Sequence, residues 1–280
     1  MSLTVRNSLA QAEQVLTQSG CTEPRANAEF LLAHLLHTSR TWLTAFGQEL
    51  LPTDKQQAYE RLVARHANGE PLAYITGFQP FCNLEISVTP DVLIPRPETE
   101  ELVEWAAHFF NPAAPLKILD LCTGSGCIAL ALAAQLPHAC VTAVDISPRA
   151  LQVARHNAER LKLQEKITFI ESNLWENVQG DFDIIVSNPP YIPSGELPGL
   201  MREVQAEPAL ALDGGPDGLR LTRQIIRRAG HFTHAGGILG LELCQGQPVG
   251  VAALLNGLGW RATVKKDIFG IERFVLAQKI

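Results

Sequence analysis

The chain has 280 residues, of which 46% are hydrophobic and 19% are charged, and its formal net charge is −6 at pH 7. That length predicts one large domain or two unequal ones, with the composition of an ordinary globular protein. The acidic balance argues against a surface that grips duplex nucleic acid through many phosphates. Residues 1–16 lack a signal-peptide pattern, and no apolar run reaches the roughly 20 residues that cross a bilayer. We therefore expect a soluble, cytoplasmic protein with no membrane partner.

The cysteines give no sign of a metal centre. They include no Cys-x-x-Cys pair, and no group of cysteines and histidines has the spacing of zinc ligands. Free thiols are the rule in a reducing compartment, so we expect free, mostly buried cysteines and no bound metal. The six residues are Cys21, Cys82, Cys122, Cys127, Cys140 and Cys244.

Residues 1–75 predict a small helical domain. An apolar stripe after Pro24 indicates one helix. Thr53 or Asp54 is placed to cap another, which should end at residues 68–69, an Asn-Gly pair. This near-neutral segment has no strand pattern and no catalytic-looking cluster, so we expect a recognition or packing element.

Residues 76–100 predict a linking β-hairpin, and residues 101–280 alternate between strands and helices. Ser147 and Pro148 show the N-cap and first-turn pattern that begins a helix. The alternation predicts an α/β fold with a parallel, doubly wound sheet. The expected strands are residues 116–121, 140–144, 167–170, 182–186 and 237–243, followed by a closing β pair at 261–266 and 273–278.

A glycine-rich loop follows the first of these strands, where doubly wound sheets bind ligands. It consists of Cys122, Thr123, Gly124, Ser125 and Gly126. Glycine lets the backbone approach a ligand closely. Asp145 ends the next strand, where a carboxylate can accept hydrogen bonds from ribose hydroxyls. The loop and this acid fit a nicotinamide dinucleotide and S-adenosylmethionine equally well, and a tight turn without a ligand would also show the loop pattern.

The strand 182–186 leads directly into Asn188, Pro189, Pro190 and Tyr191. An amide or aromatic amine delocalises its lone pair, so two acceptors on its N–H bonds would favour localisation of that pair and aim it at a methyl donor. The Asn188 side-chain oxygen and the Pro189 carbonyl can be those acceptors, and Pro190 sets the carbonyl's direction. Tyr191 offers a flat face to a planar group. We expect methyl transfer by positioning and electrostatics at this corner.

With these motifs in order, the chain resembles the release factor glutamine methyltransferase family, which acts on class 1 peptide-chain release factors. The resemblance covers nearly the whole chain. The segments that carry it are 69–77, 94–100, 120–126, 188–192, 207–208, 211–212, 214–215, 217–219 and 267–273. It implies a Rossmann-like class I methyltransferase domain behind an N-terminal helical domain that contacts the release factor, with S-adenosylmethionine as methyl donor.

The resemblance also implies roles for individual residues. The glutamine of a Gly-Gly-Gln tripeptide would be held by Asn188 and Pro189 and flanked by Tyr191, with Pro190 completing that corner. Asp145 would bind the cofactor's ribose, and residues 122–126 would run along its methionine and ribose part.

The chain departs from the family pattern in two places. Cys122 replaces the first glycine of the loop. Its small side chain fits there if its φ is below zero, so we expect retained cofactor binding with slightly altered packing. Near the adenine the chain has Asn173 and Leu174, followed by Trp175. Asn173 can bind the adenine amine, and either Leu174 or Trp175 can pack on its ring.

Several interpretations stay open at this stage. The segment with Arg96, Glu98 and Thr99 either lies near the cofactor or substrate, or simply begins a helix. Arg220, with Arg223 and Arg227, either meets an acidic partner or faces solvent. The tetrapeptide alone also fits a ribosomal-protein glutamine methyltransferase or an adenine-N6 nucleic-acid methyltransferase. The acidic balance and the absence of a large basic recognition domain argue against nucleic acid, so we expect a protein substrate and no direct nucleic-acid substrate. An NAD-dependent oxidoreductase would use the glycine loop but would leave the tetrapeptide unexplained.

Overall fold

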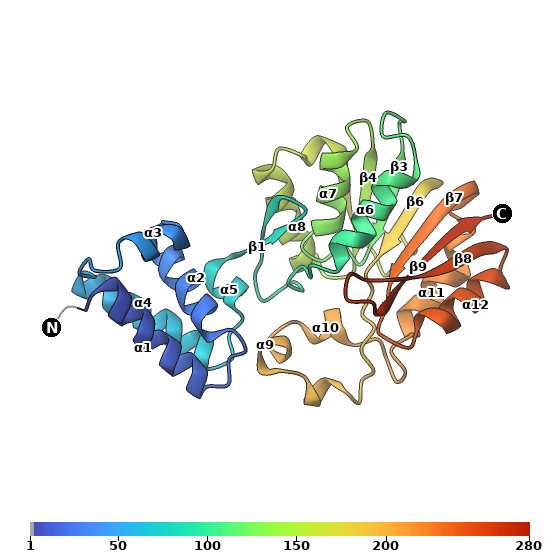
Figure 1. Ribbon diagram of the computed structural model, residues 1–280. Coiled ribbons are helices and arrows are strands. Elements are labelled where there is room, and N and C mark those ends of the chain that lie inside the picture. The colour runs from blue at the N-terminus through green and yellow to red at the C-terminus, as the bar shows by residue number, and fades with distance from the viewer. Residues whose placement is uncertain (1–2) are drawn as a thin grey trace. The chain divides into compact units, whose positions relative to one another are not determined.

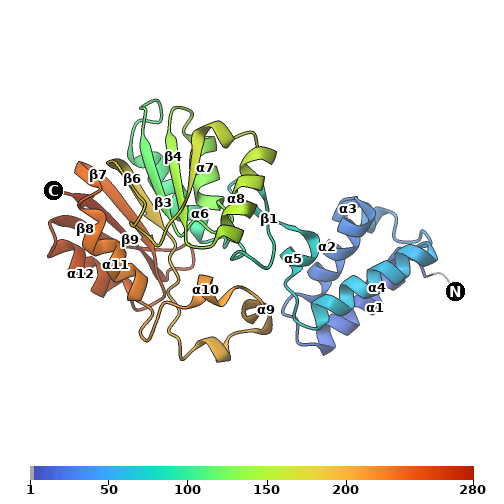
Figure 2. The same cartoon turned by 180° about the vertical axis from the view of Figure 1, so that it is seen from behind.

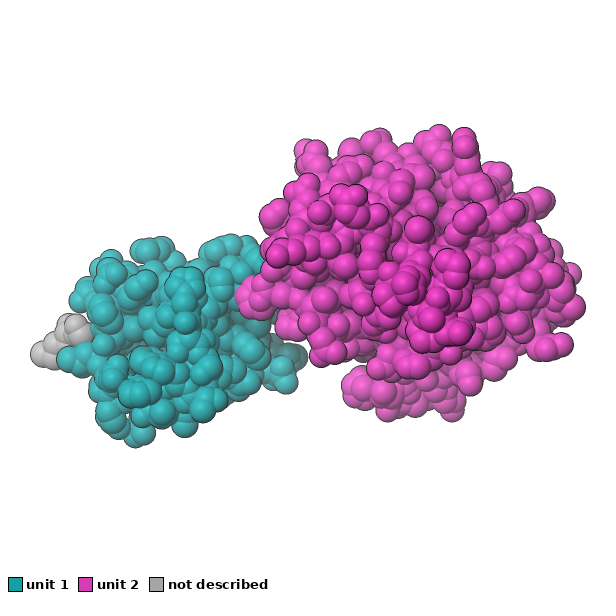
Figure 3. Space-filling view, turned by 90° about the horizontal axis from the view of Figure 1, so that it is seen from above, with its two compact units in different colours: residues 1–77, 201–206 teal, residues 78–200, 207–280 magenta. Residues whose placement is uncertain are grey.

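The structure is a computed structural model that describes residues 3–280. The chain divides into two compact units, residues 1–77 with 201–206 and residues 78–200 with 207–280, which Figure 3 colours separately. Each unit has its own hydrophobic core.

The first unit is a helical bundle, as the sequence predicted. Its main helices are α1 (Val5–Gln18), α2 (Pro24–Leu36), α3 (Arg40–Ala45), α4 (Thr53–Ala67) and α5 (Leu72–Thr76), and α9 (Arg202–Gln205) belongs to the same unit (Figure 1). The buried Tyr59 donates its hydroxyl proton to the carbonyl of Ala28 at 2.8 Å, which ties α4 to α2. The predicted cap of α4 was wrong, because Pro52 stands at the cap position and Thr53 is already the first helical residue.

The second unit contains a seven-stranded sheet in the order β5-β4-β3-β6-β7-β9-β8. The first five strands in that order run parallel, whereas β9 pairs antiparallel with both β7 and β8. The Rossmann-like α/β prediction is therefore confirmed. The strands are β3 (Lys117–Leu121), β4 (Cys140–Asp145), β5 (Ile167–Glu171), β6 (Phe182–Ser187), β7 (Thr233–Glu242), β8 (Trp260–Lys266) and β9 (Glu272–Lys279).

Helices cover both faces of this sheet, because successive side chains point to opposite faces and the apolar ones on each face must be buried. On β7, Leu239 and Leu241 join a buried cluster with residues of α11 and α12. Gly240 faces the other way, where an added Cβ would lie 2.8 Å from Leu102 of α6. The helices on the two faces are α6 (Thr99–Phe109), α7 (Cys127–Gln135), α8 (Pro148–Arg160), α11 (Arg220–Ala229) and α12 (Pro248–Asn256) (Figures 1 and 2). The short helix α10 (Ala209–Leu212) belongs to the segment between β6 and α11.

Local sequence signals explain most of these boundaries. Ser147 caps α8 by accepting from the N–H of Ala150 at 3.2 Å, and Pro148 is the first helical residue. The predicted hairpin is present as β1 (Phe78–Phe81) and β2 (Leu84–Ser87). The sequence did not predict α9 or α10, because four-residue helices are too short to show a helical period.

The cysteine prediction was partly wrong. All six are free thiols, but only Cys127 is buried. Cys140 is exposed at the start of β4, and the other four are half-buried. A small side chain next to a turn is not forced inside by its position in the sequence.

Candidate functional site

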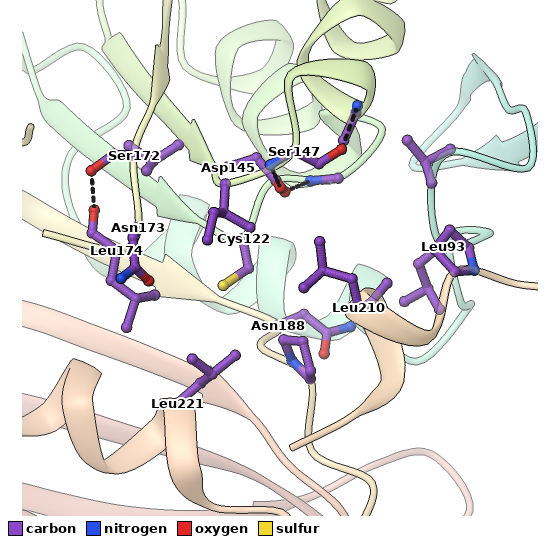
Figure 4. Close-up of a pocket in the computed structure, with 18 of the residues that line it drawn as sticks. Leu93, Cys122, Asp145, Ser147, Ser172, Asn173, Leu174, Asn188, Leu210 and Leu221 are labelled. Carbon is purple, nitrogen blue, oxygen red and sulfur yellow. Dashed lines mark hydrogen bonds between the residues drawn. The ribbon is translucent and has the colours of Figure 1, made fainter. Parts of the chain in front are cut away.

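The carboxyl ends of β3, β4 and β6 meet at one edge of the sheet. The register pairs Leu121 with Val144 on one side and with Ser187 on the other. The loops that follow these strands therefore emerge together and surround a cavity of about 190 Å³ (Figure 4). Of the predicted site residues, those that line this cavity are Cys122, Gly124, Asp145, Asn173, Leu174, Asn188 and Pro190.

The other five predicted residues do not line this cavity. The Thr123 hydroxyl donates to Asp120 at 2.6 Å. Gly126 has φ +81° at the start of α7, and an added Cβ would lie 3.1 Å from the Cβ of Ala154. Only glycine therefore allows this turn and this close helix packing together. The remaining three are Ser125, Pro189 and Tyr191.

Asp120 is fully buried beneath the loop and holds it in place. Its Oδ2 accepts from the Thr123 hydroxyl and from the Ala129 N–H of α7, at 3.2 Å. Its Oδ1 has no hydrogen-bond partner within residues 3–280. Burial raises the pKa of this carboxyl to about 7.

Asp145 is held with its carboxylate facing the cavity. Oδ2 accepts from the Gly124 N–H and Oδ1 from the Ser147 N–H, both at 2.9 Å. A carboxylate has about four lone-pair sites, so about two remain for other donors. A ligand with neighbouring hydroxyls, such as a ribose, fits this arrangement.

The structure contradicts the negative φ under which the Cys122 side chain was expected to fit. Its φ is +61°, so a non-glycine residue occupies the left-handed region that the family's glycine would adopt easily. The loop must turn sharply away from β3 at this point, and the turn decides the backbone angle despite the side chain.

The structure also shows which of Leu174 and Trp175 faces the cavity. Leu174 lines the cavity and has φ +51°. Trp175 lies in the core, where it stacks on Phe232 at 4.7 Å between ring centroids and donates its indole N–H to the Gln224 carbonyl. Asn173 donates through Nδ2 to Glu176 at 2.8 Å.

The corner after β6 is tied to two elements distant in sequence. Asn188 donates through Nδ2 to the Thr99 hydroxyl at 3.2 Å, and this hydroxyl donates to Glu242 at 2.7 Å. Tyr191 donates its hydroxyl to the same carboxylate at 3.4 Å, and its carbonyl accepts from Gln247. Burial raises the pKa of Glu242 to about 7 and also raises the pKa of Tyr191.

The structure bears on two interpretations that the sequence left open. Thr99 begins α6 and also contacts Asn188, so the segment with Arg96 and Thr99 both starts a helix and lies next to the cavity. Arg220 lines the cavity, whereas Arg223 pairs with Asp217 at 2.5 Å. Sequence reasoning missed Glu242. A charged residue at the end of an apolar strand, the signal that identified Asp145, could have found it.

Residues 3–280 contain no group of three or more His, Cys, Asp or Glu side chains that could hold a metal ion. Over the same residues, no helix is long and apolar enough to cross a membrane.

Two family models match the chain: the PrmC N-terminal domain over residues 7–77, and the methyltransferase small domain over residues 106–211. A release factor glutamine methyltransferase of Moorella thermoacetica is 41% identical over 99% of this chain and 99% of its own length. The chain belongs to the release factor glutamine methyltransferase family. One from Geobacter sulfurreducens is 43% identical over 97% of this chain and 95% of its own length.

Membership of the release factor glutamine methyltransferase family makes this chain an enzyme of the methyltransferase class. The fold agrees. A methyltransferase crystal structure from Pyrococcus furiosus has a TM-score of 0.53 and 21% identity, over 70% of this chain and 90% of that one. That structure supports the fold alone.

Proposed function

We propose that this enzyme methylates the side-chain amide N5 of the glutamine in the Gly-Gly-Gln tripeptide of class 1 release factors. The observation that carries the proposal is the position of Asn188. Its amide is held by Thr99 in the wall of a cavity that is also lined by Asp145 and the loop residues Cys122 and Gly124. The names of the relatives, which match over nearly their whole length, point to a release factor glutamine as the acceptor.

The proposed methyl donor is S-adenosylmethionine, which methyltransferases of this family generally use. The residues present fit it: Asp145 has free lone pairs for ribose hydroxyls, and Gly124 has open space where a Cβ would stand. Leu174 offers an apolar surface for the adenine, beside Asn173. When bound, S-adenosylmethionine would supply an electrophilic sulfonium methyl, and transfer would form the N–C bond as the S–C bond breaks, with one amide proton lost to solvent.

The chain's own contribution is positioning. In the proposed complex, Asn188 Oδ1 and the Pro189 carbonyl accept the two N–H bonds of the glutamine amide. These contacts hold the nitrogen so that its lone pair points along the line of displacement. Tyr191 flanks the amide plane. No side chain needs to act as a nucleophile.

The helical unit supports a protein substrate. It matches the PrmC N-terminal domain and has its own core, separate from the methyltransferase sheet. We propose that it recognises the release factor outside the tripeptide. Because the substrate is a translation factor, we also propose that the enzyme acts in the cytoplasm.

The test is transfer of labelled methyl from S-adenosylmethionine to purified class 1 release factor. We expect labelling of the intact factor and none when the tripeptide glutamine is changed to alanine. Absence of labelling on the intact factor would contradict the substrate, and labelling of the alanine version would contradict the acceptor residue. An adenine-containing oligonucleotide in a parallel reaction tests the nucleic-acid alternative.

Asn188→Ala tests the corner itself. We expect kcat to fall by about 100-fold or more, as when one preorganised polar contact to the reacting group is removed. Asn111→Ala is the matched control, because Asn111 lies in an exposed turn and does not line the cavity. Full activity of Asn188→Ala would remove the proposed mechanism.

A further inference from the structure

Behind Asn188 lies a buried chain of polar side chains from separate elements. Thr99 is the first residue of α6 and Glu242 is the last residue of β7, and they are 2% and 1% exposed. Asn188 Nδ2 lies 3.2 Å from the Thr99 hydroxyl, which lies 2.7 Å from Glu242 Oε2. The other carboxylate oxygen, Oε1, accepts from the Tyr191 hydroxyl at 3.4 Å. One carboxylate therefore connects both ends of the Asn188–Tyr191 corner.

The ionised carboxylate of Glu242 fixes which group donates and which accepts in each hydrogen bond of this chain. It can only accept hydrogen bonds, so the single proton of the Thr99 hydroxyl must point to Glu242. The Thr99 oxygen then offers only lone pairs to Asn188. The Asn188 amide must turn its NH₂ group toward Thr99, which leaves its oxygen free for an N–H group in the cavity.

We propose that Thr99 and Glu242 are positioning residues that hold the Asn188 amide with its oxygen toward the acceptor nitrogen. This inference rests on the proposed function, in which Asn188 accepts an N–H bond of the substrate amide. An unheld asparagine could rotate its side chain and present NH₂ instead. Two N–H donors would then face each other, and the acceptor nitrogen would lose a contact that orients it.

A neutral group in place of the carboxylate would no longer fix the donor and acceptor roles of Thr99 and Asn188. Protonated Glu242, or glutamine, can donate to the Thr99 oxygen and free the Thr99 proton for Asn188 Oδ1. The charged and titratable groups around Glu242 are Glu98 before α6, Tyr191 after β6 and Arg273 on β9. Burial and Glu98 raise the Glu242 pKa, Arg273 lowers it, and the result is about 7. The orientation should therefore weaken as the pH falls below neutrality.

The experiment compares Thr99→Val, Thr99→Ser and Glu242→Gln with wild type, using release factor as substrate. Thr222→Val is the matched control, because Thr222 is fully buried and its hydroxyl has no hydrogen-bond partner within residues 3–280. Glu272→Gln on β9 controls for loss of a carboxylate. Each variant is measured for kcat, for S-adenosylmethionine Kd and for melting temperature.

We expect Thr99→Val and Glu242→Gln to lower kcat by about 10- to 100-fold, with the S-adenosylmethionine Kd within about twofold of wild type. Thr99→Ser keeps the hydroxyl and should stay within about threefold of wild type. Wild-type kcat should decline as the pH falls below about 7. Glu242→Gln should lack this decline.

Two results would overturn the inference while the proposed function stands. One is wild-type methylation together with Thr99→Val and Glu242→Gln activities equal to those of the controls. The other is a loss of kcat that Thr99→Ser does not restore, or that only follows a lower melting temperature, since either would indicate a purely structural role. Failure of wild type itself to methylate release factor would contradict the proposed function, and this inference with it.

Discussion

Arg96 and Glu207 form an ion pair with 2.5 Å between Nη2 and Oε1, although 111 residues separate them. The second oxygen of Glu207 accepts from the Ile94 N–H at 3.0 Å. The Glu207 side chain is 1% exposed. Pro208 comes directly after it and Leu210 two residues later, and both line the cavity. The pair therefore ties this part of the cavity wall to the segment that precedes α6.

Glu207→Ala should destabilise the second unit and disturb the cavity. The change leaves Arg96 without its partner and the Ile94 N–H without an acceptor. We expect the free energy of unfolding to fall by about 2–4 kcal/mol, measured in urea, and S-adenosylmethionine binding to weaken. Asp217→Ala breaks an exposed ion pair with Arg223 and should leave the urea midpoint unchanged. Equal effects of the two variants would contradict this account.

Asp145→Ala should weaken S-adenosylmethionine binding while changing turnover far less. Without the carboxylate the ribose hydroxyls lose their acceptor, so we expect the S-adenosylmethionine Kd to rise by about 10- to 100-fold. The kcat at saturating donor should change far less, because Asn188 and its supports are untouched. Titration calorimetry measures the first quantity. Asp181→Ala, at an exposed position just before β6, is the control. An unchanged Kd would show that Asp145 serves only the loop.

Substitutions at Cys122 should follow its backbone angle. At φ +61° glycine relieves strain but adds freedom to the unfolded chain, so Cys122→Gly should change the free energy of unfolding by less than about 1 kcal/mol. Cys122→Val should cost about 2 kcal/mol or more, because a β-branched side chain disfavours this region strongly. Cys140→Val, in a strand, should cost little. A Cys122→Val variant as stable as Cys122→Gly would contradict the strain argument.

Glu242 should make the protein less stable as the pH rises. Its pKa is about 7 when folded, against an ordinary value of 4.5, so the folded state binds more protons between these pH values. The free energy of unfolding therefore falls across that window. Glu242→Gln removes the buried charge and should raise stability by about 1–3 kcal/mol at pH 8 and much less at pH 5. Urea denaturation at both pH values checks this. If Glu242→Gln raised the free energy of unfolding at pH 5 but not at pH 8, the pH dependence would have the opposite sign and this prediction would be refuted.

Much of the fold could be predicted from local patterns. The apolar runs of β3 and β6 are buried strands, and Ser147-Pro148 starts α8 as expected. The parallel order then brings the loop after β3, Asp145 and Asn188 to one edge. These predictions succeeded because strand and cap preferences act over a few residues, and a parallel sheet aligns its carboxyl ends.

Other features had no local signal. Nothing near Cys122 in sequence indicates a positive φ, because the angle is set by the turn that leads from β3 into α7. Leu174 and Trp175 are neighbours of similar character, and only packing against Phe232 decides which of them enters the core. The short helix α10 has too few residues to show a helical period in the sequence.

The sequence by itself determined the α/β class, the glycine loop, the acid that ends β4 and the tetrapeptide that ends β6. Only the tertiary structure decided what stands behind that tetrapeptide. Asn188 meets Thr99 across 89 residues, and Thr99 meets Glu242 across 143. The physical reason is that strand order, which local propensities do not encode, places the end of β7 beside that of β6 and lets α6 begin between them. The orientation of the Asn188 amide therefore depends on residues that no motif around it contains.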